Sequence, residues 1–291
     1  MIITVDYILC YTGLSQAFYG WSKSAVQLEM AHMLRAIIHG LDQFLQWPSI
    51  EERERMGSRY TGLFQNCVGI MDASEHPIRK VKNKEVEIST DSGYFYLQLN
   101  VIKQVTFVNL LSSFKSFENI SNLGKQSCNT IKTLSVVDRN GRFRFVHTGT
   151  HGEVNDRDQF TSSCLYTSQA DYFTDEQFVV ADGIYRGDGK TMVSYTAIEV
   201  KQDPDGSRAN FNTSFTDFRK GVENSFGRVQ MWFPILGNSK AKWNYDPVLL
   251  GYAVHACTRL HNWMMHERNL NYDPTTDPKY LFTAAWLTKK N

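Results

Sequence analysis

Three acidic residues stand where the sequence predicts that strands end or that a late helix runs: Asp72, Asp182 and Glu223. Asp72 ends a short apolar run that begins at Cys67 and predicts a buried strand. A carboxylate there costs desolvation free energy unless a cation or hydrogen-bond donors meet it. Divalent cations such as Mg²⁺ and Mn²⁺ prefer oxygen ligands, and two of them about 3.5–4 Å apart can activate water for phosphoryl displacement. The three acids are therefore candidate metal ligands and catalytic residues.

Each of these acids also has an ordinary structural explanation. A single Asp after a strand commonly caps a turn, because its carboxylate accepts hydrogen bonds from nearby backbone N–H groups. One acid is no evidence for a metal site, whereas three acids from separate elements that converge in space are. The sequence predicts that Asp72, Asp182 and Glu223 meet in one pocket.

Five strands and several helices are expected to position these acids, in the order β-β-β-α-β-β-α. Asn140-Gly141 lies between two alternating apolar segments, which is a strong signal for a β-hairpin. The expected strands cover 67–72, 125–137, 143–147, 177–181 and 191–200, and helices are expected to begin near Ser49 and Asp156 and to cover 22–45, 215–232 and 247–268. This order predicts an α/β fold with a ribonuclease H-like mixed five-stranded sheet flanked by helices.

The chain is expected to contain an N-terminal helical segment over 1–56, a ribonuclease H-like domain over 60–268 and a C-terminal tail over 269–291. Residues 14–26 resemble the last two helices of a helix-turn-helix, with a tight turn at Gly20. The helix that should precede them is missing, so the segment is interpreted as a remnant. An ordinary pair of amphipathic helices packed on the main domain is the alternative.

Composition narrows the class of protein without naming a function. Apolar residues make up 42% of the chain and charged residues 21%, which is typical of a globular protein with a substantial core. The five cysteines are widely spaced and contain no CxxC pair, which favours reduced thiols. The apolar start of the chain is too short to span a bilayer, so no membrane partner is expected. Phosphate-binding loop and serine-hydrolase motifs are absent from the sequence.

Any DNA-binding surface must be local, because the formal net charge is only +1. A cluster of cations follows the first strand, and two arginines lie on the late helix near Glu223; the predicted DNA contacts are Arg79, Lys80, Lys82, Lys84, Arg219 and Arg228. A solvated loop is the default explanation for the first group. Arg219 lies one turn before Glu223, where it could orient that carboxylate or contact phosphate.

Several blocks in the expected order resemble the Harbinger/PIF-type DDE transposases and the nucleases derived from them. The similar blocks are Gly69-Ile-Met-Asp72-Ala-Ser-Glu-His-Pro-Ile78, Gly149-Thr-His-Gly-Glu-Val-Asn-Asp156, Ala181-Asp182-Gly-Ile-Tyr185, Arg219-Lys-Gly-Val-Glu223 with Phe226-Gly-Arg228, and Leu260-His-Asn-Trp263. The resemblance implies a metal-dependent DNA endonuclease or strand transferase with Mg²⁺ or Mn²⁺ as cofactor. It implies Asp156 as a further metal ligand, although this residue is equally well placed to cap a helix.

The same resemblance implies a nuclear protein, with some cytoplasmic presence compatible, that acts on DNA. Family members work with a separate Myb/SANT-like DNA-binding partner, and a homo-oligomer is compatible with the pattern. The sequence departs from the family at Ala73 and Ser74 and over residues 94–123, which are interpreted as an insertion or a retained intron. These departures support an alternative function, a catalytically silent relative that binds DNA or protein.

Overall fold

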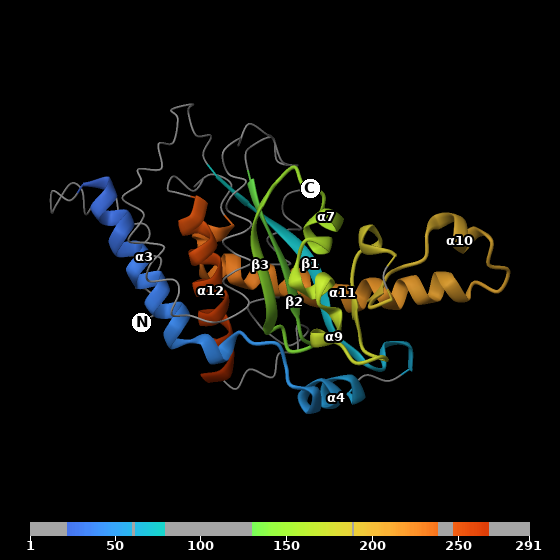
Figure 1. Cartoon of the computed structure of the whole chain (residues 1–291). Helices are drawn as coiled ribbons and strands as arrows, with labels where there is room; N and C mark the ends of the chain where they lie inside the picture. The colour runs from blue at the N-terminus through green and yellow to red at the C-terminus, as the bar shows by residue number, and fades with distance from the viewer. Residues whose placement is uncertain (1–21, 60–61, 79–129, 188, 238–246, 268–291) are drawn as a thin grey trace.

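A mixed five-stranded sheet forms the centre of the molecule (Figure 1). The computed structural model describes residues 22–59, 62–78, 130–187, 189–237 and 247–267. The strands are β1 (Cys67–Pro77), β2 (Thr130–Val137), β3 (Phe143–His151), β4 (Phe178–Val180) and β5 (Thr191–Met192), and their order across the sheet is β3-β2-β1-β4-β5. β1, β2 and β3 pair antiparallel, whereas β4 pairs parallel to β1 and β5 pairs parallel to β4. This arrangement confirms the predicted α/β fold and is consistent with a ribonuclease H-like sheet.

Helices flank this sheet, and the longest of them cross it or stand beside it (Figure 1). The described helices are α3 (Lys23–Gly40), η1 (Asp42–Phe44), α4 (Ile50–Ser58), η2 (Gly62–Phe64), α7 (Asp156–Thr161), α8 (Cys164–Thr167), α9 (Gln169–Tyr172), η6 (Gly183–Tyr185), α10 (Ala197–Lys201), α11 (Ser207–Trp232), η7 (Pro234–Leu236) and α12 (Pro247–Glu267). Two N-caps agree with the sequence: the Ser22 hydroxyl accepts from the N–H of Ala25, and the Ser49 hydroxyl accepts from that of Glu52. Of the described helices, none is long and apolar enough to cross a membrane.

Side-chain alternation divides the core between the two faces of the sheet. Ile70 on β1 packs in a cluster with Val222 of α11 and Leu250 of α12, whereas Met71 packs on the opposite face with Phe160 of α7 and Leu165 of α8. Because successive residues of a strand point to opposite faces, residue 72 shares its face with residue 70. The side chain at position 72 is therefore directed toward α11.

The final helix α12 holds the β2–β3 hairpin in place through two adjacent polar residues. The His261 Nε2 atom lies 2.9 Å from the carbonyl oxygen of Gly141 in the hairpin turn. The Asn262 carboxamide accepts from the N–H of Phe143 at 2.9 Å and donates to the Phe143 carbonyl at 2.7 Å and the Phe44 carbonyl at 2.6 Å. Gly141 has a φ of 77°, which a residue without Cβ adopts at little cost. The Leu260-His-Asn block is thus explained locally by packing of the hairpin.

Several expected element boundaries are wrong; for example, α11 begins at Ser207 and not at 215. β5 has two residues, and the segment expected to continue it turns into α10, because the Thr196 hydroxyl and the Glu199 carboxylate form a reciprocal capping box. The helix that begins at Asp156 is divided into α7, α8 and α9. β1 continues past residue 72 as far as Pro77, since β2 pairs with it over that whole length.

Several expectations fall on residues that the structure does not describe. They are most of the helix-turn-helix remnant, the cation cluster over 79–84, the segment over 94–123, the start of the second strand over 125–129 and the tail over 269–291. Three of the five cysteines, Cys67, Cys164 and Cys257, are described; they are buried and form no disulfide.

Candidate functional site

The parallel pairing of β1 with β4 brings two of the predicted acids to the same place in the sheet. Ile70 pairs with Val180, and Asp72 and Asp182 each follow two residues later. Between them lies the guanidinium group of Arg219 from α11. Its Nη2 donates to Asp72 Oδ2 at 3.1 Å, and its Nη1 lies 3.6 Å from Asp182 Oδ2. Two acids that are 110 positions apart thus share one cationic side chain.

A close approach of α11 to β1 positions Arg219 over the sheet. A Cβ atom added at Gly221 would lie 3.0 Å from Cδ1 of Ile70, so a larger residue there would require Ile70 or the helix to shift by a few tenths of an ångström. Glu223 lies one helical turn after Arg219, which places both side chains on the same side of α11. Arg219 is partly buried, whereas Glu223 is exposed to solvent.

Electrostatics link the third acid to the first two. Burial raises the pKa of Asp72 above its ordinary value, and the charges of Asp182 and Glu223 raise it further. The N–H of Ala73, which donates to Asp72 Oδ1 at 2.9 Å, and the charge of Arg219 act in the opposite direction. The carboxylates of Asp72, Asp182 and Glu223 therefore repel one another, and Arg219 relieves part of that repulsion.

The predicted convergence into a metal-binding group is not found among the described residues. No set of three His, Cys, Asp or Glu side chains in those ranges is placed to hold a metal ion. Asp72 and Asp182 meet through Arg219 rather than around a shared space, and Glu223 contributes only its charge. The predicted acids thus gather in one region without forming a coordination shell.

Asp156 occupies a different environment from the other acids. Lys132 Nζ donates to Asp156 Oδ1 at 2.7 Å and to the Val154 carbonyl at 2.7 Å, and lies 3.8 Å from Glu75 Oε1. The N-cap of α7 is Asn155, whose side chain accepts from the N–H of Asp158, so Asp156 is not the cap. Asp156 is held by a buried lysine, a partner that no pattern in the sequence indicated.

Replacement of Lys132 with Met is expected to destabilise the fold by about 3 kcal/mol, because it leaves two largely buried carboxylates without their cation. The Lys132 side chain is 3% exposed, and those of Asp156 and Glu75 are 16% and 13% exposed. The measurement is urea unfolding of wild type and variant at pH 7. Lys220→Met is the matched control: its ion pair with Asp217 is open to solvent, and it should change stability by less than about 0.5 kcal/mol. A destabilisation below about 1 kcal/mol for Lys132→Met would show that Asp156 does not depend on this lysine.

A buried tyrosine lies beside the acids. Burial raises the pKa of Tyr185 far above its ordinary value, and the charges of Asp72, Asp156 and Asp182 add to this effect. Its hydroxyl is buried and has no hydrogen-bond partner among the described residues. Tyr185 belongs to the Asp182-Gly-Ile-Tyr185 block, and this was the only sequence signal for it. The hydroxyl is therefore a buried neutral group whose nearby charges are those of three aspartates and Arg219.

The predicted DNA contacts have separate outcomes. Arg79, Lys80, Lys82 and Lys84 lie outside the described residues. Arg228 was expected on a DNA-binding surface, and this expectation is corrected: the residue is 3% exposed, its Nη1 lies 3.0 Å from Sδ of Met265 on α12, and its guanidinium lies 5.9 Å from the Trp232 ring centroid. It packs α11 against α12. Arg219 binds Asp72 and Asp182.

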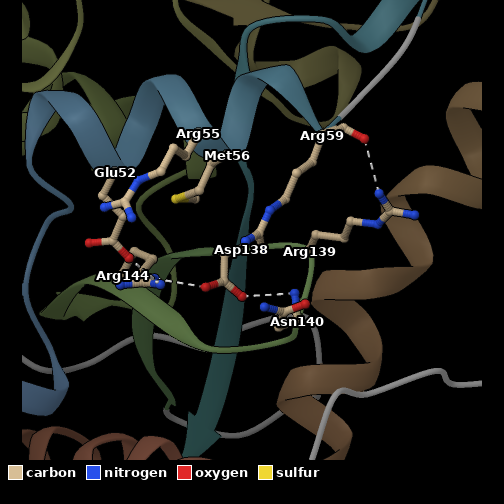
Figure 2. A pocket seen from close by; sticks show the side chains of 8 residues that line it. All are labelled: Glu52, Arg55, Met56, Arg59, Asp138, Arg139, Asn140 and Arg144. Carbon is tan, nitrogen blue, oxygen red and sulfur yellow. Dashed lines mark hydrogen bonds and ion pairs between the residues drawn. The ribbon is translucent and has the colours of Figure 1, made fainter.

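A second group of charged residues lines a pocket of about 160 Å³ between α4 and the β2–β3 turn (Figure 2). Its lining contains four arginines, two acids and two further residues: Arg55, Arg59, Arg139, Arg144, Glu52, Asp138, Met56 and Asn140. Arg144 Nε donates to Asp138 Oδ2 at 2.8 Å, and its Nη2 lies 2.9 Å from Glu52 Oε1. Arg139 Nη1 donates to the carbonyl oxygen of Arg59 at 3.2 Å (Figure 2).

The carboxylates of Asp72, Asp182 and Glu223 fit a divalent cation in their ligand type and in their charge. Carboxylate oxygens are the ligands that Mg²⁺ and Mn²⁺ prefer, and Asp72 and Asp182 already bind a positive group between them. The mutual repulsion of Asp72, Asp182 and Glu223 also favours a cation. The residues therefore fit a metal ion in type, although the described side chains as arranged do not surround one.

Comparison with known proteins supports a nuclease-like origin. Residues 118–262 match the family model for the DDE superfamily endonuclease. The match includes Asp156, Asp182 and Glu223, whereas Asp72 precedes it. No curated protein gave a significant match, and neither did any solved structure.

Proposed function

We propose that this protein is a divalent-metal-dependent DNA endonuclease or strand transferase that cleaves phosphodiester bonds with Asp72, Asp182 and Glu223. One observation supports this most strongly: Asp72 and Asp182, at equivalent positions of two neighbouring parallel strands, share a cation beside Glu223. The family match over 118–262 supports a transposase-like nuclease in general. Asp72 enters the proposal through geometry, since the match does not include it.

The proposed roles follow from where each side chain lies. Asp72 and Asp182 would hold the metal, because their Oδ2 atoms already face one positive group. Glu223, which is exposed one turn from Arg219, would complete the ligand set. A bound Mg²⁺ or Mn²⁺ supplies an activated water and stabilises the leaving oxygen. Asp156 is assigned a structural role with Lys132 in place of a ligand role.

Further parts of the proposal rest on the sequence resemblance alone. They are membership of the Harbinger/PIF-type group, DNA as the substrate, a nuclear location and a separate Myb/SANT-like DNA-binding partner. Of the predicted DNA contacts that the structure describes, Arg228 is buried and Arg219 is bound to Asp72 and Asp182. A partner that brings DNA to the acids fits this arrangement.

A silent DNA- or protein-binding relative is the second candidate function. It is favoured by the guanidinium between Asp72 and Asp182 and by the lack of a three-acid ligand group among the described residues. In that case the acids and Arg219 would form a permanent ion-pair network that stabilises the fold.

A cleavage assay separates the two candidates. The full chain is incubated with supercoiled plasmid DNA and MgCl₂ or MnCl₂, with EDTA added to a parallel sample. Metal-dependent nicking that EDTA abolishes is expected for the nuclease. Calorimetric titration with MnCl₂ provides a second measurement, and a chain that neither nicks DNA nor binds Mn²⁺ more tightly than an Asp72→Ala, Glu223→Ala double variant would exclude it.

A further inference from the structure

Arg219 binds the two acids in the manner expected of a substitute for a metal ion. Its guanidinium reaches Asp72 Oδ2 at 3.1 Å and Asp182 Oδ2 at 3.6 Å through two different nitrogen atoms. A guanidinium group carries one positive charge and five N–H donors in a rigid plane, so it can donate to two carboxylates at once and offset part of their charge. The position between Asp72 and Asp182 is therefore a cation site that a side chain of the protein occupies.

We infer that Arg219 is a built-in counter-ion, which a divalent metal must displace from Asp72 and Asp182 before it can bind. The inference rests on the proposed function, and it adds a competitor within the chain itself. The guanidinium and the metal ion need the same carboxylate oxygens, so each excludes the other. The observed metal affinity is then set by how much more tightly the acids bind the metal ion than they bind the guanidinium.

The interactions of Arg219 favour release of the guanidinium over permanent binding. Its Nε is buried and has no hydrogen-bond partner among the described residues, so one N–H donor of the guanidinium group is unsatisfied. The distance to Asp182 is longer than that to Asp72, and the Asp182 side chain is 57% exposed. Solvent screening weakens an ion pair of this kind. One half of the bridge is thus weak and open to exchange.

Calorimetric titration of the full chain with MnCl₂ in the absence of DNA tests this inference. Arg219→Gln removes the competing charge and is expected to bind Mn²⁺ about tenfold more tightly than wild type, which corresponds to about 1.4 kcal/mol for removal of the competitor. Lys201→Gln is the control: it removes the same charge from an exposed residue of α10. Its Mn²⁺ affinity should stay within about twofold of wild type.

Thermal unfolding provides a second readout that does not depend on a titration fit. Without metal, Arg219→Gln should melt below wild type, because the three acids no longer have their cation; saturating MnCl₂ should raise its melting temperature more than that of wild type. If Arg219→Gln does not fold, Arg219→Lys keeps the charge with only one point of attachment, and a Mn²⁺ affinity above that of wild type is expected.

The outcomes separate this inference from the proposed function. Equal or weaker Mn²⁺ binding by Arg219→Gln, with clear binding by wild type, overturns the inference and leaves the nuclease proposal standing. Such a result would assign Arg219 to orientation of the ligands. Lack of Mn²⁺ binding by both proteins overturns the proposed function and this inference together.

A separate observation, the arginine-lined pocket beside α4, supports a second inference. Its lining has four positive and two negative side chains. Both acids are already used inside the pocket: Asp138 accepts from the N–H groups of Asn140 and Arg142 and from Arg144, and Glu52 pairs with Arg144 as well. The eight lining side chains together carry a formal charge of +2, from four arginines and two acids.

The walls of this pocket are held by interactions outside it. Arg53, which is 5% exposed, donates from Nε to Gln177 Oε1 at 2.8 Å and from Nη1 to the Pro48 carbonyl at 2.6 Å, which fixes α4 against the segment before β4. We propose that the pocket binds a phosphate group, because guanidinium groups match the charge and the oxygen geometry of phosphate. The phosphate could come from a DNA backbone or from a free anion, and the test distinguishes these sources.

DNA binding in EDTA, measured by fluorescence anisotropy of a labelled duplex over a range of salt concentrations, provides the first arm. The double variant Arg59→Gln, Arg139→Gln should bind more weakly and reduce the slope of log K against log salt by about 0.9 for each phosphate that it no longer neutralises. Lys201→Gln on α10 controls for removal of an exposed charge and should keep the slope.

In the second arm, sodium phosphate is titrated into the protein calorimetrically. If wild type binds phosphate, the double variant does not, and both bind DNA equally, the ligand of the pocket is a free anion. Unchanged behaviour of the double variant in both arms overturns the proposal.

Discussion

Replacement of Asp72 with Asn is expected to abolish metal-dependent DNA cleavage. The substitution keeps the size of the side chain and its hydrogen bond with the N–H of Ala73, but it removes the charge that a divalent ion needs. Loss of metal chemistry worth several kcal/mol in the transition state corresponds to a fall in rate of about a thousandfold or more. The measurement is the initial rate of plasmid nicking in saturating MnCl₂.

A matched control variant is available on α11. Asp217→Asn also removes one carboxylate charge, but Asp217 is exposed and pairs with Lys220, at 2.6 Å. It should nick DNA at the wild-type rate. Comparable rates for Asp72→Asn and wild type would show that Asp72 is not a metal ligand and would leave Asp182 and Glu223 without their partner.

Asp156 gives an internal comparison among the four predicted acids. Its carboxylate is bound by Lys132, so Asp156→Asn should weaken the fold while Mn²⁺ affinity stays close to that of wild type. Glu223→Gln should do the reverse, because Glu223 is exposed and contributes charge toward Asp72. Both variants can be measured by the same calorimetric and unfolding experiments. A loss of stability would assign Asp156 a structural role, and a loss of Mn²⁺ affinity would assign Glu223 a metal-binding role.

The sequence predicted the positions of the acids better than their surroundings. Asp72 and Asp182 could be placed because each follows an apolar run of residues, and parallel strands present equivalent residues at the same level of a sheet. The bridge by Arg219 could not be predicted: helical spacing shows which side chains share a face of α11, but not which strand that face meets. Lys132 was missed because a single lysine in a strand predicts exposure, whereas here it crosses to two acids.

The secondary structure predicted for residues 191–200 was wrong because a local helix cap overrode the strand pattern. The segment over 191–200 alternates in hydrophobicity and therefore predicts a strand, yet Thr196 and Glu199 satisfy the first turn of α10 and end β5 after Met192. In contrast, the hairpin at Asn140-Gly141 was confirmed, since the left-handed conformation of Gly141 is strongly specified by residue type. Short-range signals with a stereochemical cause were thus more reliable than periodicity.

Stability is expected to fall steeply as the pH is lowered from about 6.5 toward 4, because four histidines are buried in uncharged form: His76, His147, His255 and His261. Burial lowers the pKa of His147 to about 4 and that of His255 and His261 to about 3, and it lowers the pKa of His76 as well. Nearby cations add to the effect, namely Arg259 at His255, and Arg228 and Arg142 at His261. The unfolded chain binds protons at these residues near pH 6.5, whereas the folded chain does not.

The sign of the effect follows from this difference in proton binding. A base whose pKa is lowered by folding stabilises the native state above its unfolded pKa and loses that contribution as the pH falls toward its folded pKa. Each such histidine adds about 1.4 kcal/mol per pH unit to the slope of the unfolding free energy between these two values. Urea unfolding at a series of pH values from 7 to 4.5 measures the slope.

A single substitution tests the origin of the slope. His147→Gln removes one proton-binding site from the unfolded chain, so the slope should decrease by about 1.4 kcal/mol per pH unit whatever the variant loses in absolute stability. His32→Gln, at an exposed position of α3, should leave the slope unchanged. If the two variants have equal slopes, His147 does not stay neutral in the fold, and the packing of β3 beneath α12 must admit a charge that its burial argues against.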